Sequence, residues 1–391
     1  MGPTVGIVCE SAPGERRVAM TPSALSVLNK TNAEMILETG AGLPAGIPDS
    51  DFAEKKVRIA GRDEVFSSAD VIVQVRSLGA NLDAGRADLA RMRSGQIIIG
   101  FGEPLTSTDA ARDLAERGVS FLSMELMPRI TRAQSMDALS SMATIAGYKA
   151  ALIAADTLPR MFPMLMTAAG TISPARVLVI GAGVAGLQAI ATARRLGAVV
   201  SGYDIRAAVR EQIESLGARF VVLDVGEGAA EDKGGYAKAM GEDFYRRQRE
   251  AMANVLAEQN VVITTAAVPG KKAPILITRE MVERMQPGSV IVDIAAERGG
   301  NCELTRPGEV LQWNHVAIHG PVNLPSTIPY HASQMYGRNI ATFLKYLVKD
   351  GKIALDQTDE IVRETLVTHA GEVVHMRVRE SMGLPALATV S

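Results

Sequence analysis

The chain has 391 residues, of which 47% are apolar and 21% charged, and its formal net charge is -2. A chain of this length exceeds the size at which a single hydrophobic core stops growing, so the sequence predicts two domains. The balanced charge argues against a nucleic-acid-binding protein, because such a protein needs a basic face to neutralise phosphates. The two cysteines, Cys9 and Cys302, do not form a disulfide framework and fit a reducing compartment.

The sequence shows neither a targeting segment nor a membrane span. A strand-like run begins at Thr4 without a basic region or a signal-length apolar stretch before it. The most apolar long stretch, Ser141 to Ile172, is interrupted by charged residues and prolines, whereas a spanning helix needs about 20 consecutive apolar residues. We therefore expect no direct membrane span and a cytoplasmic or peripheral location.

The N-terminal third alternates apolar strand-like runs with polar helical ones. Helices are predicted from Pro22 to Asn29, opened by Thr21, and from Ser107 to Arg117. Such alternation predicts a parallel sheet with helices on both faces. The predicted strands are Thr4 to Cys9, Glu34 to Glu38, Val71 to Val75, Gln96 to Phe101 and Val119 to Leu122.

A second strand–helix series follows a long, alanine-rich helix predicted from Ser135 to Asp156. Repetition of strand and helix is the doubly wound pattern. The predicted strands are Val177 to Ile180, Val199 to Tyr203, Arg219 to Leu223, Val261 to Thr264, Val290 to Ile294 and Val316 to His319.

The C-terminal part is expected to pack back on the first domain. It contains predicted helices from Gln334 to Val348 and from Asp359 to His369. Residues 1–140 with 330–391 would form one discontinuous Rossmann-like domain, and residues 141–329 a second one. The predicted fold class is therefore α/β, with two Rossmann-like, doubly wound parallel-sheet domains.

Only the second domain carries a dinucleotide fingerprint, in which Gly181, Gly183 and Gly186 follow a β-branched strand and open an alanine-rich helix. The first glycine allows a tight turn, the second lets the backbone approach a pyrophosphate, and the third lets helix and strand pack closely. The helix N-terminus offers N–H groups and a positive dipole end to the anion.

The cofactor is expected to be NAD(H). Asp204 lies at the end of the next strand, where a carboxylate accepts hydrogen bonds from ribose hydroxyls and repels a 2′-phosphate. Arg206 weakens this preference, because arginine can pair with a 2′-phosphate.

The histidines argue against a metal site and against a proton relay. All five lie after residue 314, and His315 and His319 fall in a strand-like stretch rather than on one helix face. Dehydrogenases of alcohols or amino acids move a proton along with the hydride, usually through His or Lys. Direct transfer between two nicotinamide rings needs only approach and orientation of the rings. The pattern therefore favours direct transfer.

Four stretches carry a family resemblance: Gly6 to Glu10, Glu15 to Pro22, Thr264 to Pro274 and Val292 to Asn301. They resemble both alanine dehydrogenases and the NAD(H)-binding component of proton-translocating nicotinamide nucleotide transhydrogenase.

Three replacements separate the two branches of this family. Where the resemblance implies a catalytic His, a substrate-binding Lys and a catalytic Asp in alanine dehydrogenases, this chain has Glu103, Arg76 and Glu297. Arg17, which would clamp a substrate carboxylate, is retained. The replacements argue against amino-acid oxidation.

The stretch from Met127 to Ser140 resembles the Arg-Gln-Asp loop of the transhydrogenase component. The resemblance implies that Arg129, Asp137 and Ser140 hold the nicotinamide and its ribose, and a carboxamide does need a donor and an acceptor of this kind. Gln134 would bridge to a second dinucleotide on a partner. A charged loop that caps the linking helix through Ser135 is the structural alternative.

A further resemblance concerns Gly226 to Met240, which is similar to the mobile loop that closes over bound NAD(H). A plain solvated loop is the alternative. The resemblance and the fingerprint together imply cofactor contacts beyond the three glycines and Asp204, namely Val184, Ile205, Arg206, Gly235, Tyr236, Gln248 and Ala267.

The resemblance implies the NAD(H)-binding subunit of a proton-translocating transhydrogenase, which forms a homodimer. Hydride would pass directly to NADP(H) on a partner subunit, and transmembrane subunits would couple this transfer to proton movement. The subunit would be held at the inner membrane through those partners. Two alternatives stay open: a free-standing amino-acid dehydrogenase with a rewired site, and an NAD-sensing module without chemistry.

Overall fold

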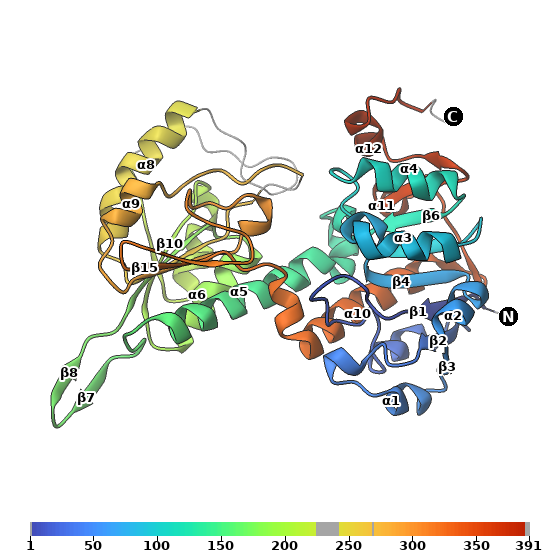
Figure 1. The fold of residues 1–391 in the computed structure, drawn as a ribbon, viewed down its shortest axis with the longest axis horizontal. Helices are drawn as coiled ribbons and strands as arrows, with labels where there is room; N and C mark the ends of the chain where they lie inside the picture. Colours follow the sequence, from blue (N-terminus) through green and yellow to red (C-terminus); the bar gives the residue numbers. More distant parts are fainter. Residues whose placement is uncertain (1, 224–241, 268–269, 388–391) are drawn as a thin grey trace. The chain divides into compact units, whose positions relative to one another are not determined.

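The computed structural model describes residues 2–223, 242–267 and 270–387. The chain divides into two compact units, Met1–Met142 with Pro325–Ser391 (unit 1) and Ala143–Leu324 (unit 2). Each unit contains a mainly parallel sheet with helices packed on it (Figure 1). The α/β fold class expected from the sequence is confirmed.

The described part of unit 1 forms an eight-stranded sheet in the order β19-β18-β6-β5-β4-β1-β2-β3. The strands β1 to β6 pair in parallel, whereas β18 and β19 are antiparallel. The strands are β1 (Thr4–Ile7), β2 (Glu34–Glu38), β3 (Arg58–Ala60), β4 (Val71–Arg76), β5 (Ile97–Phe101), β6 (Ser120–Ser123), β18 (Leu366–His369) and β19 (Glu372–Val373).

Helices bury apolar side chains against this sheet. One face packs through Ile36, Ile72 and Ile98 against α2 (Arg62–Ser68) and α4 (Thr108–Glu116). The other helices of unit 1 are α1 (Asp49–Ala53), α3 (Leu82–Arg91), α10 (Pro329–Leu347), α11 (Glu360–Thr365) and α12 (Met376–Ser381). Tyr336 of α10 is buried, and its hydroxyl donates to the carbonyl of Gln74 in β4 (2.8 Å). The C-terminal segment therefore belongs to the core of the first sheet.

Unit 2 is built on a seven-stranded sheet, in the order β11-β10-β9-β12-β13-β15-β14 over its described residues. All neighbours pair in parallel except the edge strand β14. The strands are β9 (Arg176–Ile180), β10 (Val199–Tyr203), β11 (Arg219–Phe220), β12 (Val261–Thr264), β13 (Val290–Asp293), β14 (Val310–Trp313) and β15 (Val316–His319).

Two apolar layers sandwich this second sheet. Alternate strand residues such as Val179 and Ile263 face α5 (Ala138–Thr157), α6 (Val184–Arg195) and α7 (Arg210–Ser215). Their neighbours face α8 (Glu242–Ala257) and α9 (Arg279–Glu283) on the other side. Such doubly covered parallel strands explain why these runs are continuously apolar.

Helix α5 is, among the described helices, long and apolar enough by composition alone to cross a membrane. Of its most apolar window, 44% is buried inside the protein. Its residues Ala150, Ala151 and Ala154 belong to the core of unit 2. The composition of α5 is therefore explained by packing.

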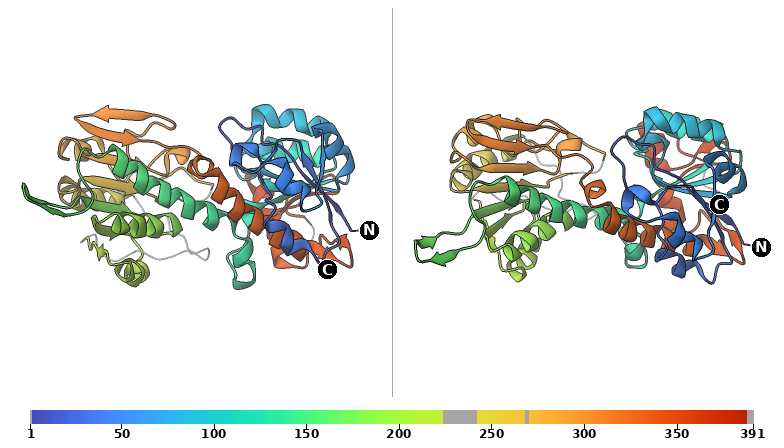
Figure 2. Two further views of the ribbon diagram at one scale, coloured as in Figure 1. Left: turned by 90° about the horizontal axis from the view of Figure 1, so that it is seen from below. Right: turned by 60° about the horizontal axis from the view of Figure 1, so that its bottom comes forward.

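Two small antiparallel hairpins were not predicted from the sequence. The hairpin of β7 (Leu165–Thr167) and β8 (Gly170–Ile172) projects from the rest of unit 2 (Figures 1 and 2). The other consists of β16 (Val348–Lys349) and β17 (Lys352–Ile353) and follows α10.

Several predicted helices have different limits in the structure. The segment from Asp359 to His369 is helical only in α11, because Leu366 to His369 pair with β6 as strand β18. The helix expected from Pro22 is a 3₁₀ turn over Ala24–Leu28. The long helix begins at Ala138 rather than Ser135, after a separate 3₁₀ helix.

Candidate functional site

The glycine loop of unit 2 lies where β9 ends and α6 begins. Gly181 has φ 97°, in the left-handed region that favours glycine. A Cβ atom on Gly186 would lie 1.8 Å from the carbonyl oxygen of Gly181, so these two residues are required by the packing of the protein itself. At Gly183, by contrast, φ is -76° and a Cβ would meet nothing within 4 Å. The protein alone does not explain this glycine, whereas a ligand close to the backbone would.

The N-terminus of α6 faces this open space with the polarity that an anion needs. Gly183 is the N-cap residue and supplies no capping side chain, and the first turn contains no acidic residue. Val184, the first residue of α6, leaves 40% of its surface exposed. An uncapped helix N-terminus beside an exposed apolar side chain can accept a phosphate and cover the adjoining part of a nucleotide.

Asp204 joins the end of β10 to the glycine loop. Its carboxylate accepts hydrogen bonds from the N–H of Ala182 (2.7 Å) and of Arg206 (2.9 Å). The Arg206 guanidinium folds back and pairs with the same carboxylate at 3.0 Å, while Ile205 between them is partly buried. The three residues predicted at the adenosine side thus lie together, and the charge of Asp204 is matched by Arg206.

A buried network not foreseen from the sequence fixes the loop after β12. The side-chain amide of Asn301 accepts from the N–H of Ala266 (3.0 Å) and donates to its carbonyl (2.8 Å). Asp293, at the end of β13, accepts from the N–H groups of Asn301 (2.7 Å) and Cys302 (3.0 Å). The network holds the main chain just before Ala267, a predicted cofactor contact that is exposed. The only sequence signal was an Asp and an Asn within a family motif.

Three of the predicted cofactor contacts cannot be judged in full. Gly235 and Tyr236 lie outside the described residues, as does the predicted mobile loop from Gly226 to Met240. Gln248 belongs to α8, but its side chain is also outside the described part. Within the residues that the structure describes, no group of three or more His, Cys, Asp or Glu side chains could hold a metal ion.

The four residues predicted to hold the nicotinamide belong to one short stretch of unit 1. Arg129 and Gln134 are exposed, and Gln134 lies in the 3₁₀ helix η5 (Thr131–Met136). Asp137 follows η5, and its carboxylate accepts from the N–H (2.9 Å) and the hydroxyl (2.5 Å) of Ser140 in the first turn of α5. Asp137 and Ser140 thus cap α5, and this arrangement is compatible with the structural alternative as well as with ligand binding.

An ion-pair cluster occupies the carboxyl edge of the unit 1 sheet between β1 and β4. The buried carboxylate of Glu15 pairs with Nε (2.7 Å) and Nη2 (2.6 Å) of Arg17 and with Nε of Arg76 (3.1 Å). Glu10 accepts from the N–H groups of Val75 and Arg76, and burial raises its pKa to about 8. The guanidinium that would clamp a substrate carboxylate is therefore already paired with a carboxylate of the protein.

The other two replaced positions also have contacts within the protein. Glu103 has φ 46°, and its N–H, like that of Gly102, donates to the carboxylate of Glu125 (2.6 Å each). Removal from water raises the pKa of Glu125 to about 7. The Glu297 carboxylate accepts from the N–H of Asn323 (3.1 Å) and thereby links two loops of unit 2.

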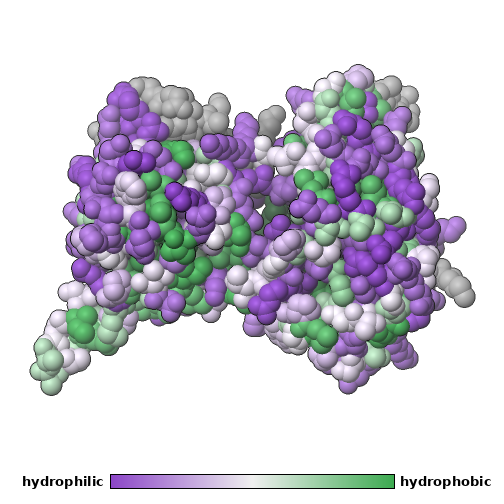
Figure 3. Space-filling model, in the orientation of Figure 1, coloured by the Kyte–Doolittle hydropathy of each residue, from purple (hydrophilic) through white to green (hydrophobic). Residues whose placement is uncertain are grey.

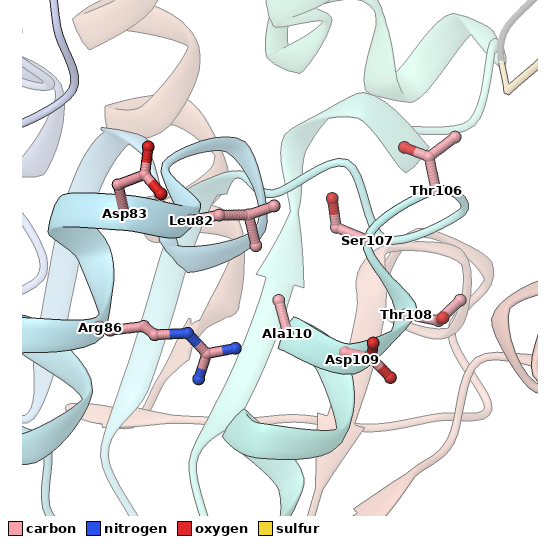
Figure 4. A pocket seen from close by; sticks show the side chains of 8 residues that line it. All are labelled: Leu82, Asp83, Arg86, Thr106, Ser107, Thr108, Asp109 and Ala110. Atoms are coloured by element: carbon pink, nitrogen blue, oxygen red, sulfur yellow. The ribbon is translucent and has the colours of Figure 1, made fainter.

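A hollow of about 460 Å³ in unit 1 lies outside these sites. Arg86 extends from α3 across it toward the start of α4 (Figure 4). Its guanidinium pairs with Asp113 (2.9 Å), and Asp83 and Asp109 also line the hollow. The charges around this hollow are mixed, and no residue predicted from the sequence lines it.

The sequence matches two family descriptions that cover most of the chain. Residues 6–146 match "Alanine dehydrogenase/PNT, N-terminal domain", and residues 150–376 match "Alanine dehydrogenase/PNT, C-terminal domain". The chain belongs to this family. Membership implies NAD(H) binding, in agreement with the glycine loop of unit 2.

Within the family, the chain is more similar to transhydrogenase subunits than to alanine dehydrogenases. It is 45% identical to an NAD(P) transhydrogenase subunit alpha protein of Rhodospirillum rubrum, over 95% of this chain and 97% of that protein. The corresponding protein of Rickettsia prowazekii is 40% identical, over 95% and 96%. The alanine dehydrogenase of Mycobacterium tuberculosis is 29% identical, over 97% of both chains.

Solved structures agree with this ranking. The transhydrogenase from Sinorhizobium meliloti superimposes with a TM-score of 0.83 at 41% identity, over 95% of this chain and 99% of that one. An L-alanine dehydrogenase reaches 0.80 at 23% identity, over 97% and 99%, and so shows the shared fold. These similarities support an oxidoreductase role as a component of an NAD(P) transhydrogenase.

Proposed function

We propose that the chain is the NAD(H)-binding subunit of a proton-translocating transhydrogenase. Hydride passes directly between NAD(H) on this chain and NADP(H) on a partner subunit, and a membrane component couples the transfer to proton movement. The chain itself is held at the inner membrane through those partners. The observation that carries the proposal is the open space over Gly183, beside the uncapped end of α6, in a family of NAD(H)-binding proteins.

Asp204 supports NAD(H) rather than NADP(H) as the ligand of unit 2. Its carboxylate is anchored on the glycine loop through Ala182 and therefore keeps its position when Arg206 moves. A ribose diol can replace the Arg206 side chain as hydrogen-bond donor to this carboxylate, whereas a 2′-phosphate would be repelled by it. One fingerprint means one dinucleotide, so NADP(H) has to be presented by another subunit.

The proposed chemistry needs positioning rather than acid–base catalysis. When bound, NAD(H) supplies the hydride at its nicotinamide ring, and the chain supplies orientation and exclusion of water. Arg129, Asp137 and Ser140 offer donors and acceptors for a carboxamide and a ribose, while Gln134 extends toward the partner's dinucleotide. Arg17 is paired with Glu15, which supports the absence of a substrate acid.

The decisive experiment uses two alanine variants that both fit the protein. Gly183→Ala meets no atom within 4 Å, and neither does Gly61→Ala at the N-cap of α2 in unit 1. We expect both to fold with unchanged melting temperatures. By calorimetry, Gly183→Ala weakens NADH binding by roughly tenfold or more, because its methyl group takes the place of the pyrophosphate, whereas Gly61→Ala binds normally. Equal affinities for the two variants would contradict the proposed site.

The reaction itself is tested by mixing the chain with a purified NADP(H)-binding partner subunit. We expect hydride transfer between an NAD analogue and NADP(H) in the mixture, and no formation of NADH when the pure chain is given alanine and NAD. Alanine-dependent NADH formation would instead establish the amino-acid dehydrogenase. Binding of NADH without transfer in the complete complex would favour the sensing module.

We also propose that two copies of the chain associate through the β7–β8 hairpin. Met164 (57%), Met166 (79%) and Ile172 (42%) are exposed there, and no charged residue occurs between Met161 and Ala175. Figure 3 shows the hairpin as a mainly hydrophobic and neutral projection. Exposed apolar surface of this kind marks an interaction site.

A charge-insertion variant tests this association. We expect Met166→Glu with Ile172→Glu to halve the mass measured by light scattering at micromolar concentration, because two carboxylates cannot be buried unpaired. The control is Met376→Glu on α12, which is 72% exposed in unit 1 and should leave the mass unchanged. A dimer that survives the double substitution would contradict the hairpin interface.

A further inference from the structure

The 3₁₀ helix η5 carries Gln134 and is longer than such helices normally are. It spans six residues, Thr131–Met136, whereas runs beyond three or four residues are uncommon because their hydrogen bonds have poor geometry. Its conformation therefore depends on contacts from outside. Side chains three residues apart lie above one another in a 3₁₀ helix, so η5 presents three rows of two residues each.

Each row of η5 has a different environment. Ala133 and Met136 form the first row and are buried in unit 1. Thr131 and Gln134 form the second row, and both are exposed. The third row consists of Arg132 and Ser135, which are bonded to the C-terminal segment of the chain.

The first of these bonds is a triangle of polar side chains. Nη1 of Arg132 donates to the hydroxyl of Tyr346 (3.0 Å) and to Oδ2 of Asp359 (3.0 Å), and the Tyr346 hydroxyl donates to the same oxygen (2.6 Å). The other oxygen of Asp359 caps α11 through the N–H groups of Ile361 and Val362. The carboxylate is therefore held in place before Arg132 reaches it.

The second bond comes from Asn339 in α10. Its side-chain nitrogen donates to the carbonyl of Ser135 (2.9 Å), while its buried Oδ1 lacks a partner among the described residues. A buried polar atom without a partner is unfavourable and needs an explanation. Here the amide is retained at a buried position for the sake of a single bond to η5.

We propose that Asp359, Tyr346 and Asn339 are positioning residues for hydride transfer. They fix the rotation of η5 about its axis, which sets the direction of Gln134 and, one residue after η5, the place of Asp137. They lie more than 200 residues further along the chain than the segment they hold. This inference rests on the proposed function, because it requires that the Arg129–Ser140 segment contact the reacting dinucleotides.

The test removes the triangle without removing the cap of α11. Arg132→Met with Tyr346→Phe deletes every bond from η5 to Asp359 and leaves the carboxylate on α11. The matched control is Arg363→Met. Arg132 and Arg363 are both exposed to 52%, but Arg363 pairs with its neighbour Glu364 rather than with η5.

Two quantities are measured for each variant: the Kd for NADH of the pure chain, and the single-turnover rate of hydride transfer in the complex with the NADP(H)-binding subunit. We expect the double variant to lower the rate by roughly tenfold, because small misplacements of reacting groups are costly. Its Kd for NADH should change less than about twofold, because the dinucleotide is held by its diphosphate in unit 2. Arg132→Lys, which keeps the charge, should restore part of the rate, and Arg363→Met should resemble the wild type.

Gln134→Ala in the same assay separates this inference from the proposed function. If Gln134→Ala slows transfer and the double variant does not, the positioning role is wrong and the proposed function stands. If neither slows transfer, the segment does not take part in the reaction. A parallel loss of rate and NADH affinity in the double variant would mean a general structural role and would also overturn the positioning role.

Discussion

The two units have the same kind of sheet but differ at the edge where such sheets bind ligands. Ligands of doubly wound sheets lie at the carboxyl ends of the strands, where the strand order changes direction. In unit 2 this place is between β9 and β12, and in unit 1 between β1 and β4. The first holds a glycine loop with open space over Gly183, and the second holds the paired side chains of Glu15, Arg17 and Arg76. The topology therefore offers a place, and the residues at the edge decide whether a ligand can use it.

The sharpest break between the two units is expected from one type of substitution made in each. A Cβ on Gly186 of unit 2 would lie 1.8 Å from a carbonyl oxygen, and a Cβ on Gly79 of unit 1 would lie 1.9 Å from another. Both Gly186→Ala and Gly79→Ala should lower the free energy of unfolding by about 1–3 kcal/mol, because the core is overpacked. Only Gly186→Ala should also abolish NADH binding, by roughly 100-fold or more, because it displaces the loop that holds the diphosphate. Calorimetry and urea unfolding check both expectations, and normal binding by Gly186→Ala would remove the distinction.

A second contrast concerns charge. The carboxylate of Glu15 is buried and compensates Arg17, so Glu15→Gln should lower the free energy of unfolding by about 3–5 kcal/mol, since it leaves a buried charge unpaired. The affinity for NADH should not change, because the cluster is structural. Glu34→Gln, at an exposed position of β2, is the matched control and should be neutral. Weakened NADH binding by a folded Glu15→Gln protein would show that unit 1 contributes a binding site of its own.

A third contrast concerns how each unit holds its edge loops. Unit 2 uses the neutral amide of Asn301, which bonds both main-chain groups of Ala266 and the carbonyl of Pro274. Asn301→Ala should cost about 2–3 kcal/mol in urea unfolding, because it leaves these buried groups without a partner. Asn301→Asp keeps the acceptor and loses the donors, so it should fall between the two. Wild-type stability of Asn301→Ala would mean that water replaces the amide.

Local patterns in the sequence were sufficient for the parts of the site that depend on neighbouring residues. The glycine loop could be predicted because Gly181, Gly183 and Gly186 follow a β-branched strand, and both sheets could be predicted from the alternation of strands and helices. The β7–β8 hairpin was missed, because its strands pair only with each other and show no alternation of buried and exposed residues. The segment after Asp359 was taken as one helix, since its apolar spacing does not reveal that Leu366 to His369 pair with β6.

Contacts between distant residues could not be predicted in the same way. Asn301 acts on Ala266, 35 residues earlier, and Arg132 on Asp359, 227 residues later. Each is a polar side chain whose partner is chosen by the fold rather than by a nearby motif. Asp204 shows both cases, because its place after the strand was expected, whereas its pairing with Arg206 was not.

The smallest expected effect is a dependence of stability on pH that originates in unit 1. The pKa of Glu125 is raised from its ordinary 4.5 to about 7 in the folded protein, because the carboxyl group is removed from water. The fold therefore favours the protonated form, and the resulting stability is fully present below about pH 4.5 and is lost as the pH rises through about 7. Gln resembles the protonated acid: it can accept from Gly102 and Glu103 and cannot ionise.

Urea unfolding of the wild type and of Glu125→Gln at pH 5, 6, 7 and 8 isolates this contribution. Other groups that titrate, including Glu10, are present in both proteins, so their contributions cancel in the difference. We expect the wild type to lose stability relative to Glu125→Gln by on the order of 1 kcal/mol per pH unit between pH 5 and 7, and no further above pH 8. Parallel profiles would mean that Glu125 is ionised in the folded protein over this range. It would then hold Gly102 and Glu103 as a carboxylate, and the edge of unit 1 would carry one more negative charge than the paired cluster implies.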